Sequence, residues 1–199
     1  MKPFTTLLAT LLATSAFAGE TRQLDAHEHG VGALNIAIDD NTIAMELHAP
    51  GADIVGFEYA ATSAEDLSAI ESAVRTLSRP LELIVLPGSA ECTVLEAEAG
   101  LEADGEHDHD HDEDHAAADQ DHDHDHADEE HAEPEGHSEF HAEYLLTCAN
   151  PGAISRIDFA YFEAFENAMK LEIQIVSATG SRAFVVERSS PALELPGMF

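Results

Sequence analysis

The sequence predicts an α+β fold: a mainly antiparallel sheet with one or two helices, and a disordered His/Asp/Glu-rich insert in a hairpin. Three observations predict it. Apolar residues alternate with polar ones in many short runs, as half-buried strands require. One stretch has an apolar stripe at helical spacing, and one tract consists almost entirely of acids, histidine, alanine and glycine. One helix among many strands is typical of the α+β class.

The first segment, residues 1–18, has the pattern of a secretory signal peptide. Lys2 gives a positive start, residues 4–17 carry no charge, and the closing Ala-Phe-Ala has the form of a cleavage site. This uncharged stretch is shorter than the roughly 20 residues that span a bilayer. We therefore expect a secreted chain that is not inserted in the membrane after signal removal.

The first element of the mature chain is a predicted β-hairpin. Apolar residues alternate in 34–38 and again in 43–47, and the segment 39–42 has turn-forming residues. Pairing Ile38 with Ile43 places all six apolar side chains on one face, as a half-buried sheet requires.

A helix is predicted next, between Ser63 and Pro80. Ser63 and Asp66 form an S-x-x-D capping box at its start, and Pro80 closes the segment. Apolar residues at helical spacing form a stripe that we expect in the core: Leu67, Ile70, Val74 and Leu77.

The rest of the chain is predicted to be mostly strands. They are expected at 81–86, 92–97, 143–148, 154–159, 171–176 and 182–187, with a short helix or a loop at 161–170. Residues 19–199 are predicted to form a single metal-binding domain with its own core. Within it, 98–138 contain no Ile, Val, Phe or Tyr, so burial cannot offset the entropy of ordering them. We expect a flexible metal-binding loop there.

The charge balance excludes several classes of partner. The chain has 40 acidic and 8 basic residues, a net charge of −32 with neutral histidines. Such a surface repels nucleic acid and anionic membranes, and it attracts cations. We expect divalent metal ions as partners and no nucleic acid.

Cys92 and Cys148 are the only cysteines. In an oxidising compartment they favour a disulfide, and the alternative is a thiolate metal site. If the surrounding strands pair antiparallel with the cysteines opposite each other, the midpoint of the pairing falls at Gln120. The acidic tract would then be the extended tip of a hairpin, with a disulfide across its neck.

The segment Glu106–His141, which we call the tract, carries ten of the thirteen histidines, many of them alternating with aspartate. In an extended chain alternate residues point to the same side, so neighbouring histidines can share an ion. Imidazole suits Zn, Cu and Ni, and carboxylates add oxygen ligands and negative charge. The predicted Zn(II) ligands of the tract are His107, His109, His111, His115, His122, His124, His126, His131, His137 and His141.

Other interpretations of the tract fit less well. An acidic linker would need no histidine, and calcium would leave the imidazoles unused. Copper(I) prefers sulfur ligands, which the tract lacks, whereas nickel stays open. A pH sensor is a separate alternative, because imidazole titrates near neutral pH. Protonated imidazole binds no metal, so capture should weaken below about pH 6.

Three histidines lie outside the tract: His27, His29 and His48. His27 and His29 are predicted as a two-ligand metal site, with exposed strand-end histidines as the alternative. In the predicted hairpin register His48 faces Ala33 on the polar face. At about 3.3 Å per residue His29 then lies roughly 13 Å from Ala33, too far to share an ion with His48 unless a glycine bends the strand.

Two motifs carry a family resemblance. Residues 27–30 read His-Glu-His-Gly, and residues 50–58 read Pro-Gly-Ala-Asp-Ile-Val-Gly-Phe-Glu. With Cys148 and Pro151, they resemble the ZrgA-like family of bacterial periplasmic zinc-uptake accessory proteins over most of the mature chain. Members often have histidine after Gly-Phe-Glu, where this chain has Tyr59.

The resemblance implies a mixed α/β fold, zinc sites in and near the histidine-rich region, and a role beside the binding protein or permease of a zinc ABC importer. We expect capture of Zn(II) by the His-rich loop and assistance to uptake. The alternative is a periplasmic buffer or detoxification protein that binds Zn, Ni or Cu without delivery. A third alternative is a stand-alone importer binding protein, although the chain is short for two lobes. No enzyme is predicted, since nucleophile–base, phosphate-loop and H-E-x-x-H patterns are absent from the sequence.

Overall fold

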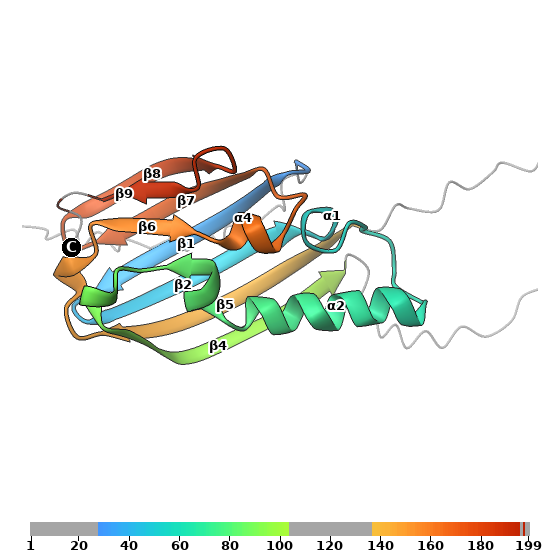
Figure 1. Cartoon of the computed structure of the whole chain (residues 1–199), viewed down its shortest axis with the longest axis horizontal. Helices are drawn as coiled ribbons and strands as arrows, with labels where there is room; N and C mark the ends of the chain where they lie inside the picture. The colour runs from blue at the N-terminus through green and yellow to red at the C-terminus, as the bar shows by residue number, and fades with distance from the viewer. Residues whose placement is uncertain (1–27, 104–136, 196, 198–199) are drawn as a thin grey trace, which may run out of the picture.

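The computed structural model describes residues 28–103, 137–195 and 197. Their strands form a six-stranded sheet, in the order β4-β5-β2-β1-β7-β8, and a three-stranded sheet, β3-β6-β9 (Figure 1). The large sheet contains β1 (Val31–Asp39), β2 (Thr42–Pro50), β4 (Cys92–Ala103), β5 (Ser138–Cys148), β7 (Lys170–Ser177) and β8 (Gly180–Glu187). The small sheet contains β3 (Ile84–Val85), β6 (Arg156–Phe159) and β9 (Ala192–Glu194).

The helices of the described residues are short apart from α2. They are α1 (Gly51–Ile54), α2 (Ala64–Leu77), α3 (Pro80–Leu83) and α4 (Tyr161–Ala164), with 3₁₀ turns at Gly88–Ala90 and Pro151–Ala153. None of the helices in these residues is long and apolar enough to cross a membrane. The predicted α+β class with a mainly antiparallel sheet is confirmed.

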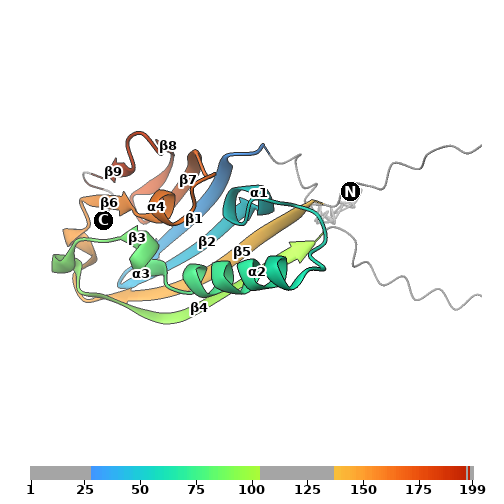
Figure 2. The same ribbon diagram turned by 45° about the vertical axis from the view of Figure 1, so that its right-hand side comes forward.

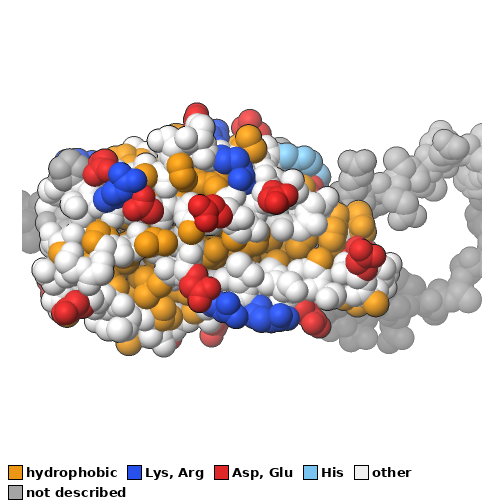
Figure 3. Space-filling model, viewed as in Figure 1, with side chains coloured by type: hydrophobic (Ala, Val, Ile, Leu, Met, Phe, Trp, Pro, Cys, Tyr) orange, Lys and Arg blue, Asp and Glu red, His pale blue; other side chains and the backbone are white. Residues whose placement is uncertain are grey.

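One face of the large sheet carries the core. Figures 1 and 2 show the helices and the small sheet on this face, and the described residues leave the opposite face uncovered. Leu34, Leu171 and Ile175 point into the core and are almost fully buried. Figure 3, drawn in the view of Figure 1, shows hydrophobic side chains that reach the surface between α2 and the small sheet. The uncovered face carries the outward-facing residues of each strand, which include Glu46 and Gln174 but also exposed Val176 and Val185.

The predicted hairpin and helix are confirmed. Ile38 pairs with Ile43 in the β1–β2 register, so the six apolar residues share the core face. The hydroxyl of Ser63 accepts a hydrogen bond from the Asp66 backbone N–H at 3.0 Å, which caps α2. The expected core stripe is wrong at Leu67, which is 48% exposed, because the first turn of α2 extends past the end of β4 (Figure 1).

The predicted strand at 81–86 is wrong in its first half. Pro80 begins the helical turn α3, and the strand is reduced to Ile84 and Val85. Proline fits the first helical position because its missing N–H would have no partner there. Apolar alternation at 81–86 thus reflects a turn and a short strand that both face the core.

Residues 98–103 belong to β4, so the start of the predicted flexible loop at 98 is wrong. Ala97, Ala99 and Leu101 pack against the core, and every residue from 96 to 103 pairs with β5. Backbone pairing on one side and partial burial on one face are enough to order a strand of low apolar content.

The β4–β5 hairpin confirms the predicted neck. Cys92 pairs with Cys148, and a disulfide joins them. The register shifts by one residue at Leu95, where the strand has a bulge. We call the disulfide end of this hairpin the neck, and the opposite end, where Ala103 pairs with Ser138, the mouth.

Two features of the sheet have no local signal in the sequence. β1 pairs in parallel with β7, from Val31 with Lys170 to Ala37 with Val176. The small sheet joins β6 to β9 near the C-terminus. The predicted signal peptide (1–18) lies outside the described residues. So do nine predicted ligands: His27, His107, His109, His111, His115, His122, His124, His126 and His131.

Candidate metal centre

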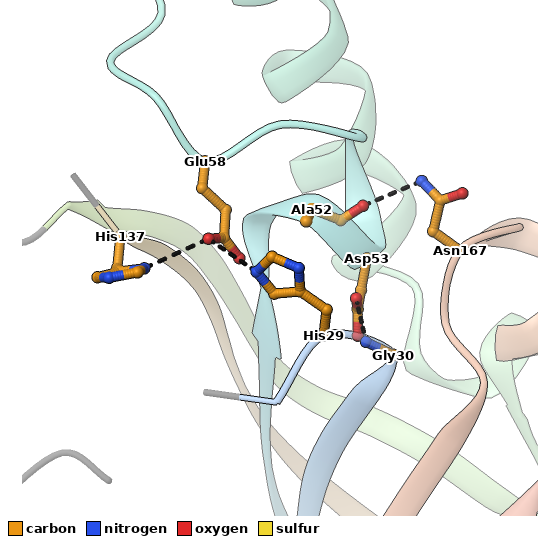
Figure 4. Close-up of polar contacts among 7 residues, drawn as sticks. All are labelled: His29, Gly30, Ala52, Asp53, Glu58, His137 and Asn167. Carbon is orange, nitrogen blue, oxygen red and sulfur yellow. Dashed lines mark hydrogen bonds and ion pairs between the residues drawn. The ribbon is translucent and has the colours of Figure 1, made fainter. Parts of the chain in front are cut away.

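Histidine and carboxylate side chains meet at the mouth in two groups. The first, which we call the mouth cluster, consists of His29, Asp53, Glu58 and His137 (Figure 4). The second, the strand cluster, consists of His48, Glu139 and His141. Both lie where the chain leaves β4 and enters β5.

The mouth cluster is assembled from three segments far apart in the sequence. His29 precedes β1, Glu58 follows α1, and His137 directly precedes β5. The backbone N–H of Gly30 donates to Asp53 Oδ1 at 2.7 Å, which ties the start of β1 to α1. The two motifs at 27–30 and 50–58 therefore meet in space.

The local fold of α1 depends on a close backbone approach. A Cβ at Gly51 would lie 2.3 Å from Ser138 Oγ and 2.7 Å from the Phe57 carbonyl oxygen, so only glycine fits. The Asn167 side chain donates to the Ala52 carbonyl at 3.0 Å from the other side (Figure 4). Glycine thus allows α1 to pack against β5 and brings Asp53 and Glu58 to the mouth.

One oxygen of Glu58 lies at the centre of the cluster. Its Oε2 is 3.2 Å from His29 Nε2 and 3.4 Å from His137 Nδ1. Figure 4 shows the two imidazoles on either side of this carboxylate. Both histidines are more than half exposed, whereas the Glu58 side chain is 14% exposed. The cluster is therefore a buried carboxylate approached by two accessible imidazoles.

Two carboxylate oxygens of the cluster are buried without a hydrogen-bond partner among the described residues. They are Asp53 Oδ2 and Glu58 Oε1. Burial raises the pKa of Asp53, although the Gly30 N–H and nearby His29 oppose the rise. Unpaired buried anionic oxygens are costly, and a bound cation would satisfy them. Two imidazole nitrogens and such oxygens are the donor set that Zn(II) takes.

The strand cluster arises from pairing in the sheet. His48 on β2 pairs with His141 on β5, and Pro50 pairs with Glu139. One ligand atom from each of its three residues lies within 4.8 Å of the others. The hydrogen bond that His48 donates to Glu139 raises the pKa of His48; partial burial lowers it, and Glu46 raises it further.

The predicted residues are thus divided between the two clusters. His29 and His137 meet at Glu58, while His141 joins His48, which the sequence had placed opposite Ala33. Sequence reasoning missed Asp53, Glu58 and Glu139. Residues 48, 139 and 141 lie on the same face of the sheet. The sequence could have indicated the strand cluster only if the pairing of β2 with β5 had been known.

Tyr59, which stands where the resembling family often has histidine, lies outside the mouth cluster. Its ring stacks on Phe57, its hydroxyl donates to Asp66 Oδ1 at 3.4 Å, and it is 58% exposed. The tyrosine therefore packs toward α2, and the cluster has its two imidazoles from His29 and His137.

A family model described as ZrgA family zinc uptake protein matches residues 26–195. The matched range contains the tract, both clusters and both cysteines. No curated protein matches the sequence.

Proposed function

The chain belongs to the ZrgA family of zinc uptake proteins, and we propose that it captures Zn(II) in the periplasm and assists its uptake by an ABC importer. The histidines of the tract are the capture element, and the mouth cluster is a structured seat for one captured ion. The importer's binding protein or permease is the proposed recipient.

One observation carries the proposal: the mouth cluster lies at the base of the segment that holds the other histidines. We call the described residues 28–103 and 137–195 the frame. His137 is the last histidine before β5 and contacts Glu58 of this frame. An ion bound at His137 would therefore lie beside a site with buried carboxylate oxygens. Buried oxygens that lack partners favour a cation more strongly than solvated ones, because water does not compete for them.

The charge of the chain supports capture from dilute solution. A net charge of −32 raises the local concentration of cations and speeds their encounter. Many overlapping His/Asp sites give capacity, whereas the frame gives fixed geometry. In this proposal the tract captures ions, and the mouth cluster binds one of them in a fixed geometry.

A second function is favoured by the number of histidines. Ten in one segment exceed what a single transfer site needs, and this surplus supports storage or detoxification of Zn, Ni or Cu without delivery. Growth of a deletion strain separates the two. A defect under zinc chelation supports delivery, while sensitivity only to added metal would support the buffer.

The capture role is tested with a full-length variant in which the eight histidines from His107 to His131 are replaced by asparagine. We call it the tract-null variant. Elemental analysis after zinc loading should show loss of most bound zinc, with the ions of the frame retained. Equal stoichiometry in the tract-null variant and the natural chain would mean that capture lies elsewhere. His29→Gln in the tract-null background should then remove one further ion.

A further inference from the structure

We propose that the strand cluster is a second structured site for a divalent transition metal ion, separate from the mouth cluster. Its ligands are His48 Nδ1, His141 Nε2 and Glu139 Oε2, with Glu102 as the fourth. Zn(II) is the ion that this set of two imidazoles and two carboxylates suits best. The site holds whether or not the tract captures zinc.

Two of the distances between ligand atoms match a tetrahedral site, and a third is shorter. Bond lengths of about 2.0–2.2 Å place neighbouring ligand atoms of tetrahedral zinc about 3.3–3.6 Å apart. Glu139 Oε2 lies 3.4 Å from His48 Nδ1 and 2.8 Å from His141 Nε2. Glu102 Oε2 lies 3.4 Å from the same nitrogen of His141. The ligand atoms of His48, Glu139 and His141 all lie within 4.8 Å of one another, close enough for one ion to contact all three after side-chain adjustment.

The ligands are held in place by strand pairing. His48 pairs directly with His141, and Glu139 precedes His141 by two residues on the same face. The imidazole rings lie edge to face, with centroids 4.3 Å apart. On β4, Glu102 pairs with Glu139, which brings a third strand to the site. Because the pairing of three strands holds the ligand residues in position, these residues lose little conformational entropy when an ion binds.

Glu46 completes the arrangement as an outer contact. Its Oε1 lies 3.1 Å from His48 Nε2, the nitrogen that is not aimed at Glu139. A carboxylate that accepts from one imidazole nitrogen leaves the other free to bind metal and raises its basicity. Histidine ligands of zinc are commonly oriented by such a carboxylate.

The surroundings favour entry of a cation. Glu46 also lines a hollow of about 640 Å³ on the uncovered face of the sheet, together with Glu96, Glu98 and Glu143. The residues that line this hollow include no lysine or arginine. The field of these carboxylates draws cations toward the site, and the imidazoles then select a transition metal over calcium.

The test uses the full-length tract-null variant, so that the tract does not hide single sites. Zinc stoichiometry is measured by titration calorimetry and by elemental analysis after dialysis. Two ions are expected in this background. His48→Gln and His141→Gln should each remove one, while Glu46→Gln should keep both and weaken one by about 10–100-fold. Glu71→Gln, on the exposed surface of α2, is the matched control and should change nothing.

The results separate this site from the mouth cluster. His29→Gln should remove the other ion, and the double variant His29→Gln/His48→Gln should bind none. Unchanged stoichiometry in His48→Gln and in His141→Gln would overturn the strand site and leave these residues as an ion-paired cluster. Unchanged stoichiometry in His29→Gln alone would overturn only the mouth site. Thermal melts in chelator show that each variant is folded, and anomalous scattering at the zinc edge places the ion directly.

Discussion

The two ends of the β4–β5 hairpin differ in kind. At the neck a disulfide joins Cys92 to Cys148, and Cys148 is completely buried. At the mouth lie the mouth cluster and the strand cluster, which are made of histidine and carboxylate side chains. The same pair of strands is therefore joined by a covalent bond at one end and carries the proposed metal sites at the other. This contrast teaches that one pair of strands can carry a covalent link at one end and a group of candidate metal ligands at the other.

The strongest test of this contrast removes the covalent end. Cys92→Ser with Cys148→Ser should lower the free energy of unfolding by about 2–5 kcal/mol, since the unfolded chain regains a large loop. Zinc stoichiometry should stay the same, because the strand of β5 separates neck from mouth by roughly 33 Å. Denaturant melts and zinc titration measure the two quantities. Loss of zinc together with stability would show that the ends are not independent.

The second test measures how much bound zinc raises the free energy of unfolding through the sites at the mouth. In the tract-null variant, zinc at 100 times its dissociation constant should add about 2.7 kcal/mol of stability per frame site. Glu58→Gln should abolish one such increment, because the carboxylate between His29 and His137 loses its charge. Chemical denaturation with zinc or with chelator gives the increment. An undiminished gain in Glu58→Gln would exclude this carboxylate as a ligand.

The third test compares glycines at the two ends. Gly51→Ala should cost about 1–3 kcal/mol, because its Cβ would meet Ser138 Oγ and the Phe57 carbonyl. It should also weaken the mouth site by displacing α1. Gly88, beside the neck, has nothing within 4 Å of an added Cβ, so Gly88→Ala should change stability by less than about 0.5 kcal/mol. Equal costs at the two positions would contradict the close packing of the mouth.

The smallest effect concerns an ion pair just beyond the neck. Arg156 holds the pKa of Asp158 below its ordinary value. Ionised Asp158 therefore stabilises the fold above about pH 4, and this contribution is lost as the pH falls through the lowered pKa. Asp158→Asn should lower the melting temperature slightly at neutral pH, and the two proteins should converge in acid. A large effect at neutral pH would mean that charge, rather than the disulfide, secures this end.

Much of the frame follows from local signals. The β1–β2 register follows from alternation, the start of α2 from its cap, and the neck from two cysteines in strand-like surroundings. The parallel β1–β7 pair does not, because no residue near 31 or 170 specifies a partner so distant in sequence. At 80–83 the apolar alternation suggested a strand, while Pro80 favoured the helical turn that forms.

The candidate site divides in the same way. Histidines draw attention by their number, so His29, His137 and His141 were expected ligands. Asp53, Glu58 and Glu139 were missed because the chain has 40 acidic residues, so a single one does not indicate a metal site. Only the tertiary fold selects these three, by burying them: Asp53 is 2% and Glu139 is 8% exposed. Burial of a carboxylate is a long-range property that no short motif encodes.

The pairing of Ala103 with Ser138 has a consequence for how such a protein can change over time. The segment between them starts and ends at adjacent positions on one sheet, so its length is not constrained by the frame. In general, doubling the length of a flexible loop costs only about 0.6 kcal/mol in closure entropy. Insertions or deletions between these two positions should therefore leave the paired strands and the disulfide at the neck in place.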